Sequence, residues 1–323
     1  MPTANANPNI ERPAARRVLL VEDDVPLTQL VREKLAPYGY NVQVHHQARS
    51  AYQAIAQTRP HLLVLDVMLG DGAGYQVARR VRSDAGLYLT PILFMSTLGD
   101  KREVEYALRQ GGDAYLTKPF TLQDLVQRLD ELQRLSEALH KRNPLTGLYG
   151  IERLKREVDR RLFLEESFAL CAASIDYLDA YTARHGEQAG LEVAACLAHS
   201  IAHVMREQGY PHHLSHASPT HFYFFAPADS YKRTCRHVVH RFAEESSRFY
   251  TAEELAQKYM VASKHQGVYA GYPLMEARLC VASSAHKRFA CAREAFTQLE
   301  AAREHSHDKE ESRVFTFKQG KKW

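Results

Sequence analysis

The sequence predicts an α/β domain built on a parallel sheet, followed by a second domain of α+β type. In the first half, short runs that are apolar along their whole length alternate with helix-like stretches, which is typical of a parallel sheet covered by helices on both faces. In the second half, HFYFFAP (221–227) follows a predicted helix after a short connection, which favours antiparallel pairing. The length of 323 residues also favours two domains over one.

Acidic and basic side chains stand where the predicted strands of the first half end. The apolar runs are RVLLVE (17–22), HLLVLD (61–66), PILFMS (91–96) and AYLT (114–117), with helices expected over stretches such as 25–37 and 47–58. Sites in such sheets lie beyond the carboxyl ends of the strands. We therefore expect Glu22, Asp23 and Asp66 to meet at one edge. Asp24 is expected to cap the helix that follows it.

This edge has the residues for phosphoryl transfer to an aspartate. Carboxylates suit Mg²⁺, which prefers oxygen ligands and keeps positions open for phosphate oxygens. An aspartate can attack a phosphoryl donor to give an acyl phosphate. Lys118, directly after the last run, is the candidate cation for the developing charge, and the Ser96 hydroxyl is a candidate partner for a phosphoryl oxygen.

Residues 17–120 resemble the receiver domain of bacterial response regulators. The resemblance rests on VLLVEDD, VLDVMLGDGAGYQ, PILFMS and AYLTKPF, in the family's order and spacing. It implies a doubly wound, five-stranded parallel domain over 16–135, after a disordered tail at 1–15, with phosphorylation by a sensor histidine kinase or phosphotransfer protein. It also implies these roles: metal ligands Glu22, Asp23 and Asp66, with the backbone carbonyl of Met68; phosphoacceptor Asp66; switch residues Ser96 and Tyr115; and phosphate-pairing Lys118.

A long helix is expected to connect the domains over 121–143. Leu122, Leu125, Leu129, Leu132 and Leu139 fit one heptad ladder. These leucines have two interpretations. Either they form the buried face of the receiver's last helix, or they pair the helix with a second copy, and we expect a homodimer from the second. Asn143-Pro144 then ends the helix.

The second half resembles the GGDEF domain of diguanylate cyclases. Its predicted elements are helices at 152–163, 188–207, 231–247 and 287–303, and strands at 168–175, 221–226 and 277–283. The resemblance covers 143–318 and rests on NPLTGLYG (143–150), SIDYLDAYTARHGEQAG (174–190) and HASPTHFYFF (216–225). It implies a domain over 144–323 with a central antiparallel or mixed sheet.

The catalytic signature of that family is absent from this sequence. Ser218, Pro219, Thr220, His221 and Phe222 occupy the positions of Gly-Gly-Asp/Glu-Glu-Phe. Asp176 alone matches a metal aspartate, and two-metal chemistry needs several bridging oxygens. We therefore expect no cyclase activity, and a domain that serves as a protein-interaction or dimerisation module for an unknown downstream protein. The alternative is a binder of GTP or cyclic di-GMP without turnover.

The remaining composition argues against several other classes. The net charge is +4, with 45% hydrophobic and 25% charged residues, so no strong attraction to nucleic acid is expected and no recognition helix is evident. The sequence shows neither a membrane span nor a signal peptide, and five cysteines without CxxC spacing fit a reducing cytoplasm. Histidines cluster between residues 212 and 221, which is interpreted as a polar loop, with a metal site as the alternative.

Overall fold

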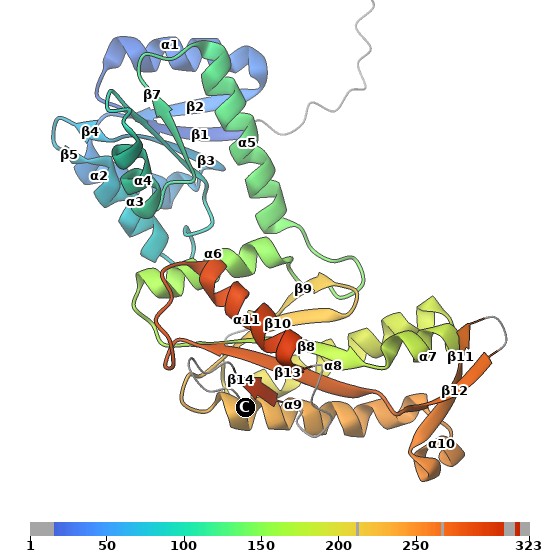
Figure 1. The fold of residues 1–323 in the computed structure, drawn as a ribbon. Helices are drawn as coiled ribbons and strands as arrows, with labels where there is room; N and C mark the ends of the chain where they lie inside the picture. Colours follow the sequence, from blue (N-terminus) through green and yellow to red (C-terminus); the bar gives the residue numbers. More distant parts are fainter. Residues whose placement is uncertain (1–15, 211–212, 266–267, 307–313, 317–323) are drawn as a thin grey trace, which may run out of the picture. The chain divides into compact units, whose positions relative to one another are not determined.

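The computed structural model describes residues 16–210, 213–265, 268–306 and 314–316 (Figure 1). The chain divides into two compact units, Met1–Glu137 and Ala138–Trp323. The tail expected at 1–15 lies outside the described residues. Among the helices that are described, none is both long and apolar enough to cross a membrane.

The first unit is a five-stranded parallel sheet with helices on both faces. The strand order is β2-β1-β3-β6-β7, and every pair in it is parallel. The strands are β1 (Arg16–Val21), β2 (Tyr40–His45), β3 (Leu62–Asp66), β6 (Ile92–Ser96) and β7 (Ala114–Thr117). A small hairpin of β4 (Met68–Leu69) and β5 (Gly72–Ala73) follows β3.

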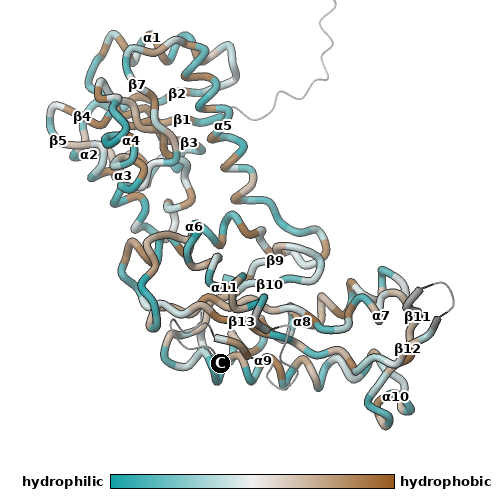
Figure 2. Tube along the Cα trace, in the orientation of Figure 1, coloured by the Kyte–Doolittle hydropathy of each residue, from teal (hydrophilic) through white to brown (hydrophobic). Residues whose placement is uncertain are grey.

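Alternate residues of each strand face two separate apolar cores. Val18 and Leu20 pack with α1 (Val25–Leu35) and α5 (Leu122–His140). Leu19 and Val21 pack with α2 (Ala48–Thr58), α3 (Gly74–Ser83) and α4 (Lys101–Arg109). The central strands are buried on both faces, which explains why their sequences are apolar without alternation. Figure 2 shows hydrophobic residues gathered along the strands.

The packing of α5 corrects the leucine-ladder interpretation. Leu125, Leu129 and Leu132 are 1%, 0% and 3% exposed and belong to the first unit's own core. Leu122 packs partly against the same core, and Leu139 is also buried. Leucines already buried inside one chain cannot form a seam with a second copy. The helix ends at His140 rather than at residue 143, and a homodimer stays a prediction without this support.

The second unit has a mixed sheet in the order β14-β13-β8-β10-β9. Its strands are β8 (Ala169–Asp176), β9 (Ser215–Ser218), β10 (His221–Ala226), β13 (Glu276–Ser283) and β14 (Val314–Thr316). The pair β13–β14 is parallel and the other three are antiparallel. As expected, the middle strands β8 and β10 are antiparallel.

Helices cover both faces of this second sheet. One core includes residues of α6 (Ile151–Phe163) and α11 (Ala292–Ser306). The other includes residues of α7 (Leu178–His185), α8 (Glu187–Glu207) and α9 (Tyr231–Ser246). The short elements η1 (Ala36–Tyr38), η2 (Ser247–Phe249) and α10 (Ala252–Gln257), and the hairpin of β11 (Tyr259–His265) and β12 (Val268–Pro273), complete the described elements.

Candidate functional site

The ends of four parallel strands bring the predicted site residues of the first unit together. Glu22 and Asp23 follow β1, Asp66 ends β3, Ser96 ends β6 and Lys118 follows β7. Parallel strands carry their carboxyl ends to one edge of the sheet. Residues that lie far apart in sequence therefore share one site.

Three carboxylates form a grouping that fits a divalent cation. One oxygen from each of Glu22, Asp23 and Asp66 lies within 4.8 Å of the others. Glu22 and Asp66 are buried, at 1% and 6% exposure, whereas Asp23 is exposed. Oxygen donors, partial burial and one open side match the ligand preference of Mg²⁺.

The electrostatics of Glu22 show how strongly this site lacks positive charge. Burial raises the pKa of Glu22 to about 7, and the negative charge of Asp66 adds to the rise, although the hydrogen bond from Lys118 opposes it. Bringing like charges together out of water disfavours ionisation. A bound cation would relieve this cost, so the residues present fit the Mg²⁺ site that was predicted.

Lys118 bridges the two buried acids. Its Nζ lies 2.6 Å from Glu22 Oε2 and 2.6 Å from Asp66 Oδ2. Burial alone would lower the pKa of Lys118, but the hydrogen bonds to Asp66 and Glu22 raise it above its ordinary value. The amino group therefore stays charged beside the carboxylate that is the candidate nucleophile.

The backbone after β3 holds Asp66 in place. Asp66 Oδ1 accepts a hydrogen bond of 2.9 Å from the Met68 amide, so the Met68 backbone adjoins the site, while the role of its carbonyl stays a prediction. A Cβ added at Gly74 would lie 2.0 Å from the Asp66 carbonyl oxygen. Glycine is required there because the chain passes so close to the site.

Ser96 and Tyr115 both contact the loop that follows β6. Ser96 is 1% exposed, and its hydroxyl oxygen accepts a hydrogen bond of 3.1 Å from the Leu98 amide. The Tyr115 hydroxyl donates to the Leu98 carbonyl at 2.5 Å. A ligand that forms a hydrogen bond with the Ser96 hydroxyl would therefore weaken its contact with the Leu98 amide. Tyr115 binds the carbonyl of the same residue.

Asp24 stands apart from the acidic grouping. Its carboxylate accepts a hydrogen bond of 2.9 Å from the Leu27 amide and caps α1. The prediction that this acid is a helix cap is confirmed.

In the second unit, Asp176 is paired with an arginine. Arg278 Nε lies 2.9 and 2.8 Å from the two carboxylate oxygens of Asp176, and its NH2 lies 2.6 Å from Oδ2. Arg278 is 9% exposed, and its NH1 also donates to the Ser306 carbonyl. Arg278 could not be expected from the sequence, because 102 residues separate it from Asp176 and no local pattern links them.

Residues 218–222, expected to be a degenerate catalytic signature, form a short turn with its own hydrogen bonds. The His221 Nδ1 atom lies 2.9 Å from Ser218 Oγ and 2.8 Å from Thr220 Oγ1. Phe222 is fully buried in the core. Pro219 stands between Ser218 and Thr220. None of the residues 218–222 is acidic, so this turn carries no carboxylate of its own.

The histidines around this turn have separate partners. His213 Nε2 lies 3.5 Å from Glu157 Oε1, and His216 Nδ1 lies 3.0 Å from Thr146 Oγ1. Burial lowers the pKa of His213, His216 and His221. His212 lies outside the described residues. Within the described residues, the acidic grouping of the first unit is the one set placed to hold a metal, so the histidine metal site gains no support.

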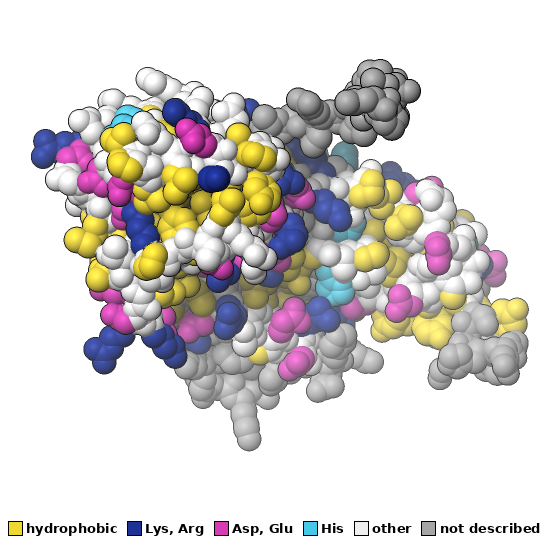
Figure 3. All heavy atoms as spheres, turned by 90° about the horizontal axis from the view of Figure 1, so that it is seen from above, with side chains coloured by type: hydrophobic (Ala, Val, Ile, Leu, Met, Phe, Trp, Pro, Cys, Tyr) yellow, Lys and Arg dark blue, Asp and Glu magenta, His cyan; other side chains and the backbone are white. Residues whose placement is uncertain are grey.

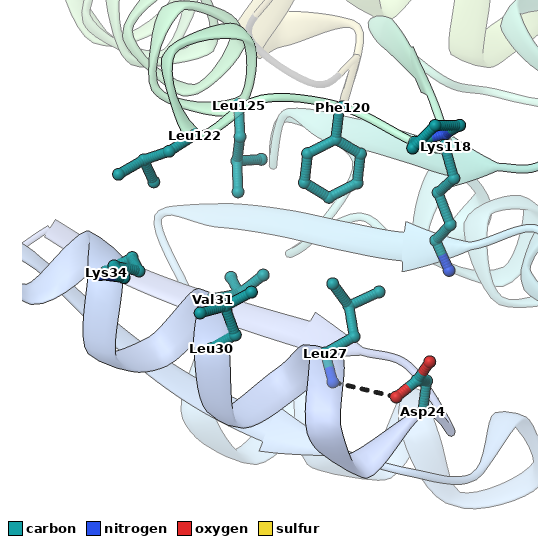
Figure 4. A pocket seen from close by; sticks show the side chains of 10 residues that line it. Asp24, Leu27, Leu30, Val31, Lys34, Lys118, Phe120, Leu122 and Leu125 are labelled. Atoms are coloured by element: carbon teal, nitrogen blue, oxygen red, sulfur yellow. Dashed lines mark hydrogen bonds between the residues drawn. The ribbon is translucent and has the colours of Figure 1, made fainter.

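An apolar groove lies beside the acidic site of the first unit (Figure 4). Its volume is about 550 Å³. Leu27 and Val31 of α1 face Phe120, Leu122 and Leu125 across it, and Asp24 and Lys118 stand at one end. Figure 3 looks down on the face that carries α1, where hydrophobic side chains gather.

Comparison with known proteins identifies the first unit. The family model "Response regulator receiver domain" matches residues 18–130. The transcriptional regulatory protein TrcR of Mycobacterium tuberculosis is 41% identical over 39% of this chain and 48% of its own length. GltR of Pseudomonas aeruginosa is 31% identical over 50% of this chain and 66% of its own length. The receiver domain of Klebsiella pneumoniae RstA, solved in its BeF₃-activated form, is 27% identical over 36% of this chain and 98% of that one, with a TM-score of 0.34.

The first unit therefore belongs to the class of α/β signalling domains with an acidic pocket at the strand ends. Residues 18–130 are a response regulator receiver domain. The chain spans about half the length of the first curated relative it matches, at 48% of TrcR.

Proposed function

We propose that the chain is a phosphorylation-dependent response regulator whose phosphoacceptor is Asp66. A carboxylate oxygen of Asp66 attacks the phosphorus of the donor, the new P–O bond gives an acyl phosphate, and the bond to the donor's leaving group breaks. Glu22, Asp23, Asp66 and the Met68 carbonyl would hold Mg²⁺. The bound ion would neutralise charge on the phosphoryl oxygens.

The observation that carries this proposal is the position of Lys118. Its amino group lies 2.6 Å from Asp66 and 2.6 Å from Glu22, so a cation already stands beside the attacking carboxylate. Positive charge at this point stabilises the developing charge of the transferred group. The Lys118 amine can then turn from the carboxylates to a phosphoryl oxygen.

The response is proposed to spread through the loop after β6. The Ser96 hydroxyl would bind a phosphoryl oxygen and release the Leu98 amide that it now accepts from. Because Tyr115 donates to the carbonyl of the same Leu98, the two side chains would move together. The acyl phosphate thus favours one of two loop arrangements, as a population shift.

The phosphodonor is proposed to be a sensor histidine kinase or a phosphotransfer protein. A donor must bring its phosphohistidine to Asp66 while burying enough surface to bind. The groove lined by Leu27, Val31 and Phe120 runs up to Lys118. It offers apolar contact beside the reacting carboxylate.

The second unit is proposed to be a catalytically inactive GGDEF-like module that binds another protein. The Asp176 carboxylate is neutralised by Arg278, and residues 218–222 carry no acid. This ion pair competes with any metal for Asp176, and residues 218–222 offer no second carboxylate to share one, which supports the absence of cyclase chemistry. TrcR and GltR carry the name transcriptional regulatory protein, but the chain covers only 48% and 66% of their lengths, so a transcriptional output is not proposed for this unit.

Phosphorylation is tested by labelling the full chain with acetyl phosphate and Mg²⁺. Asp66→Asn removes the nucleophile, so we expect the mass increase of one phosphoryl group to disappear in intact-protein mass spectrometry. Asp24→Asn is the matched control, because asparagine also caps helices well, and it should label like the wild type. Continued labelling of Asp66→Asn would contradict the assignment.

The second unit is tested by calorimetric titration of the full chain with GTP and cyclic di-GMP in Mg²⁺. We expect no saturable heat, and no product in a sensitive cyclase assay of the phosphorylated chain. Tight binding without product would instead favour the regulatory nucleotide binder. Appearance of cyclic di-GMP would overturn the inactive assignment.

A further inference from the structure

The hairpin β4–β5 directly follows Asp66 and forms a compact arm. Met68 pairs with Ala73 and Leu69 pairs with Gly72, and the Gly74 amide donates to the Val67 carbonyl at 3.0 Å. Gly70 and Asp71 form its tip. The arm therefore places two consecutive residues at a fixed position beside the acidic grouping.

Asp71 ties this arm to the start of α2. Its carboxylate oxygens accept hydrogen bonds from the Ala48 amide at 2.7 Å and the Arg49 amide at 3.1 Å. Gln47, the residue before α2, gives no side-chain cap. Asp71 thus caps α2 from a distant part of the chain, and these amides lower the pKa of the Asp71 carboxyl.

Gly70 reaches the exposed acid of the metal grouping. Its amide donates a hydrogen bond of 2.9 Å to Asp23 Oδ2. Lys118 holds Glu22 and Asp66, so the three carboxylates are restrained by two different parts of the molecule. The Gly70 contact uses one oxygen of Asp23 and leaves the other for a cation.

We propose that the hairpin β4–β5 positions Asp23 for Mg²⁺, with the Gly70 amide orienting the carboxylate and Asp71 anchoring the arm to α2. This inference rests on the proposed function in one respect, that Asp23 is a Mg²⁺ ligand. An exposed carboxylate loses side-chain conformational entropy when it binds a metal. A hydrogen bond from a fixed amide restricts the side chain before binding, so less entropy is lost when the metal binds. Hydrogen bonds to the ligands of a metal generally change its affinity by tenfold or more.

Direct Mg²⁺ binding to the full chain, measured by calorimetry, tests this role. Gly70→Pro removes the amide hydrogen, so we expect Mg²⁺ affinity to fall about tenfold. Gly70→Ala keeps the amide, but its Cβ would stand 3.2 Å from Asp23 Oδ2, so the carboxylate must shift slightly and affinity should fall by less than in Gly70→Pro. A smaller loss with alanine than with proline separates the hydrogen bond from a general effect of losing glycine.

Asp71→Ala provides a second variant in case proline disturbs the hairpin. Its matched control is Asp100→Ala, because Asp100 caps α4 through the Arg102 and Glu103 amides at 2.8 and 3.0 Å. Both changes remove a helix cap, but only Asp71 anchors the arm. We expect Mg²⁺ affinity to fall several-fold for Asp71→Ala and to stay unchanged for Asp100→Ala.

Labelling with acetyl phosphate at varied Mg²⁺ supplies the readout specific to positioning. In Gly70→Pro the half-saturating Mg²⁺ concentration should rise about tenfold, while the rate at saturating Mg²⁺ stays within about twofold. Unchanged or tighter Mg²⁺ binding in a folded Gly70→Pro chain would overturn the inference, as would equal effects of Asp71→Ala and Asp100→Ala. If the wild type binds Mg²⁺ but is not labelled, the proposed function fails while the positioning role is still decided by the binding data.

Discussion

Glu22 is the residue on which the balance of charge in the receiver site depends. It is 1% exposed and shares the Lys118 amine with Asp66. One amino group cannot fully compensate two buried carboxylates, so the ionised form of Glu22 is costly without a metal. The pKa of about 7 expresses this cost.

Glu22→Gln is expected to stabilise the metal-free protein in a pH-dependent way. The folded pKa of Glu22 lies above its ordinary value of 4.5, so its stabilising contribution is present below about pH 4.5 and is lost as pH rises through about 7. Glutamine does not titrate. The gain should therefore be small at pH 5 and reach about 1–3 kcal/mol at pH 8.

Thermal unfolding in EDTA, followed by circular dichroism at pH 5 and pH 8, measures this difference. Excess Mg²⁺ should reverse its sign, since the wild type then gains a metal ligand that glutamine lacks. Glu33→Gln is a control, because Glu33 is an exposed acid on α1. An equal gain at both pH values would contradict the interpretation of Glu22.

At the scale of elements, one ion pair joins three parts of the second unit. Asp176 ends β8, Arg278 lies on β13, and the Ser306 carbonyl at the end of α11 accepts from the same guanidinium. Removing one partner of a buried pair leaves an uncompensated charge, which costs more than the pair itself contributes.

Asp176→Ala is expected to lower the free energy of unfolding by about 2–4 kcal/mol. Adding Arg278→Met should recover much of this loss, because an apolar side chain of similar length leaves no unpaired charge. Glu152→Ala, which breaks the exposed Lys155–Glu152 contact, should cost less than about 0.5 kcal/mol. Urea denaturation measures all three, and a double variant no more stable than Asp176→Ala would contradict the role of the pair.

Sequence reasoning was most successful for elements whose burial is uniform. The strands β3 and β6 are buried at every residue and are therefore apolar throughout. The edge strand β2 alternates buried and exposed residues at its start, and no apolar run marked it. The receiver acids could be expected to meet because strand ends in a parallel sheet converge.

Contacts that depend on tertiary structure could not be predicted from the sequence. The amide of Gly70 has no sequence signature, and Asp71 caps a helix that starts 23 residues before it. Arg278 likewise gave no local sign of its partner. The leucines of α5 fitted both interpretations, because a helix buried against its own sheet and a dimer seam need the same apolar stripe; burial of Leu129 decides for the first.

At the scale of the whole molecule, each unit has its own apolar cores. Leu129 of α5 is fully buried in the first unit, and Leu197 of α8 is fully buried in the second. A unit with its own core is expected to unfold as its own cooperative step.

Differential scanning calorimetry of the full chain should therefore show two transitions. Leu129→Ala and Leu197→Ala each delete buried methyl groups, at a cost of about 2–5 kcal/mol, and each should lower one transition while leaving the other nearly unchanged. Mg²⁺ should raise only the transition that Leu129→Ala lowers. A single transition that shifts with either change would contradict separate unfolding.

The Asp176–Arg278 pair also constrains how this chain can evolve. Replacement of Arg278 alone would leave the Asp176 carboxylate unpaired, and replacement of Asp176 alone would leave the guanidinium unpaired. Either first step passes through a less stable protein. Selection for stability therefore tends to keep Asp176 and Arg278 together or to replace both. The ion pair makes single substitutions at either position unfavourable.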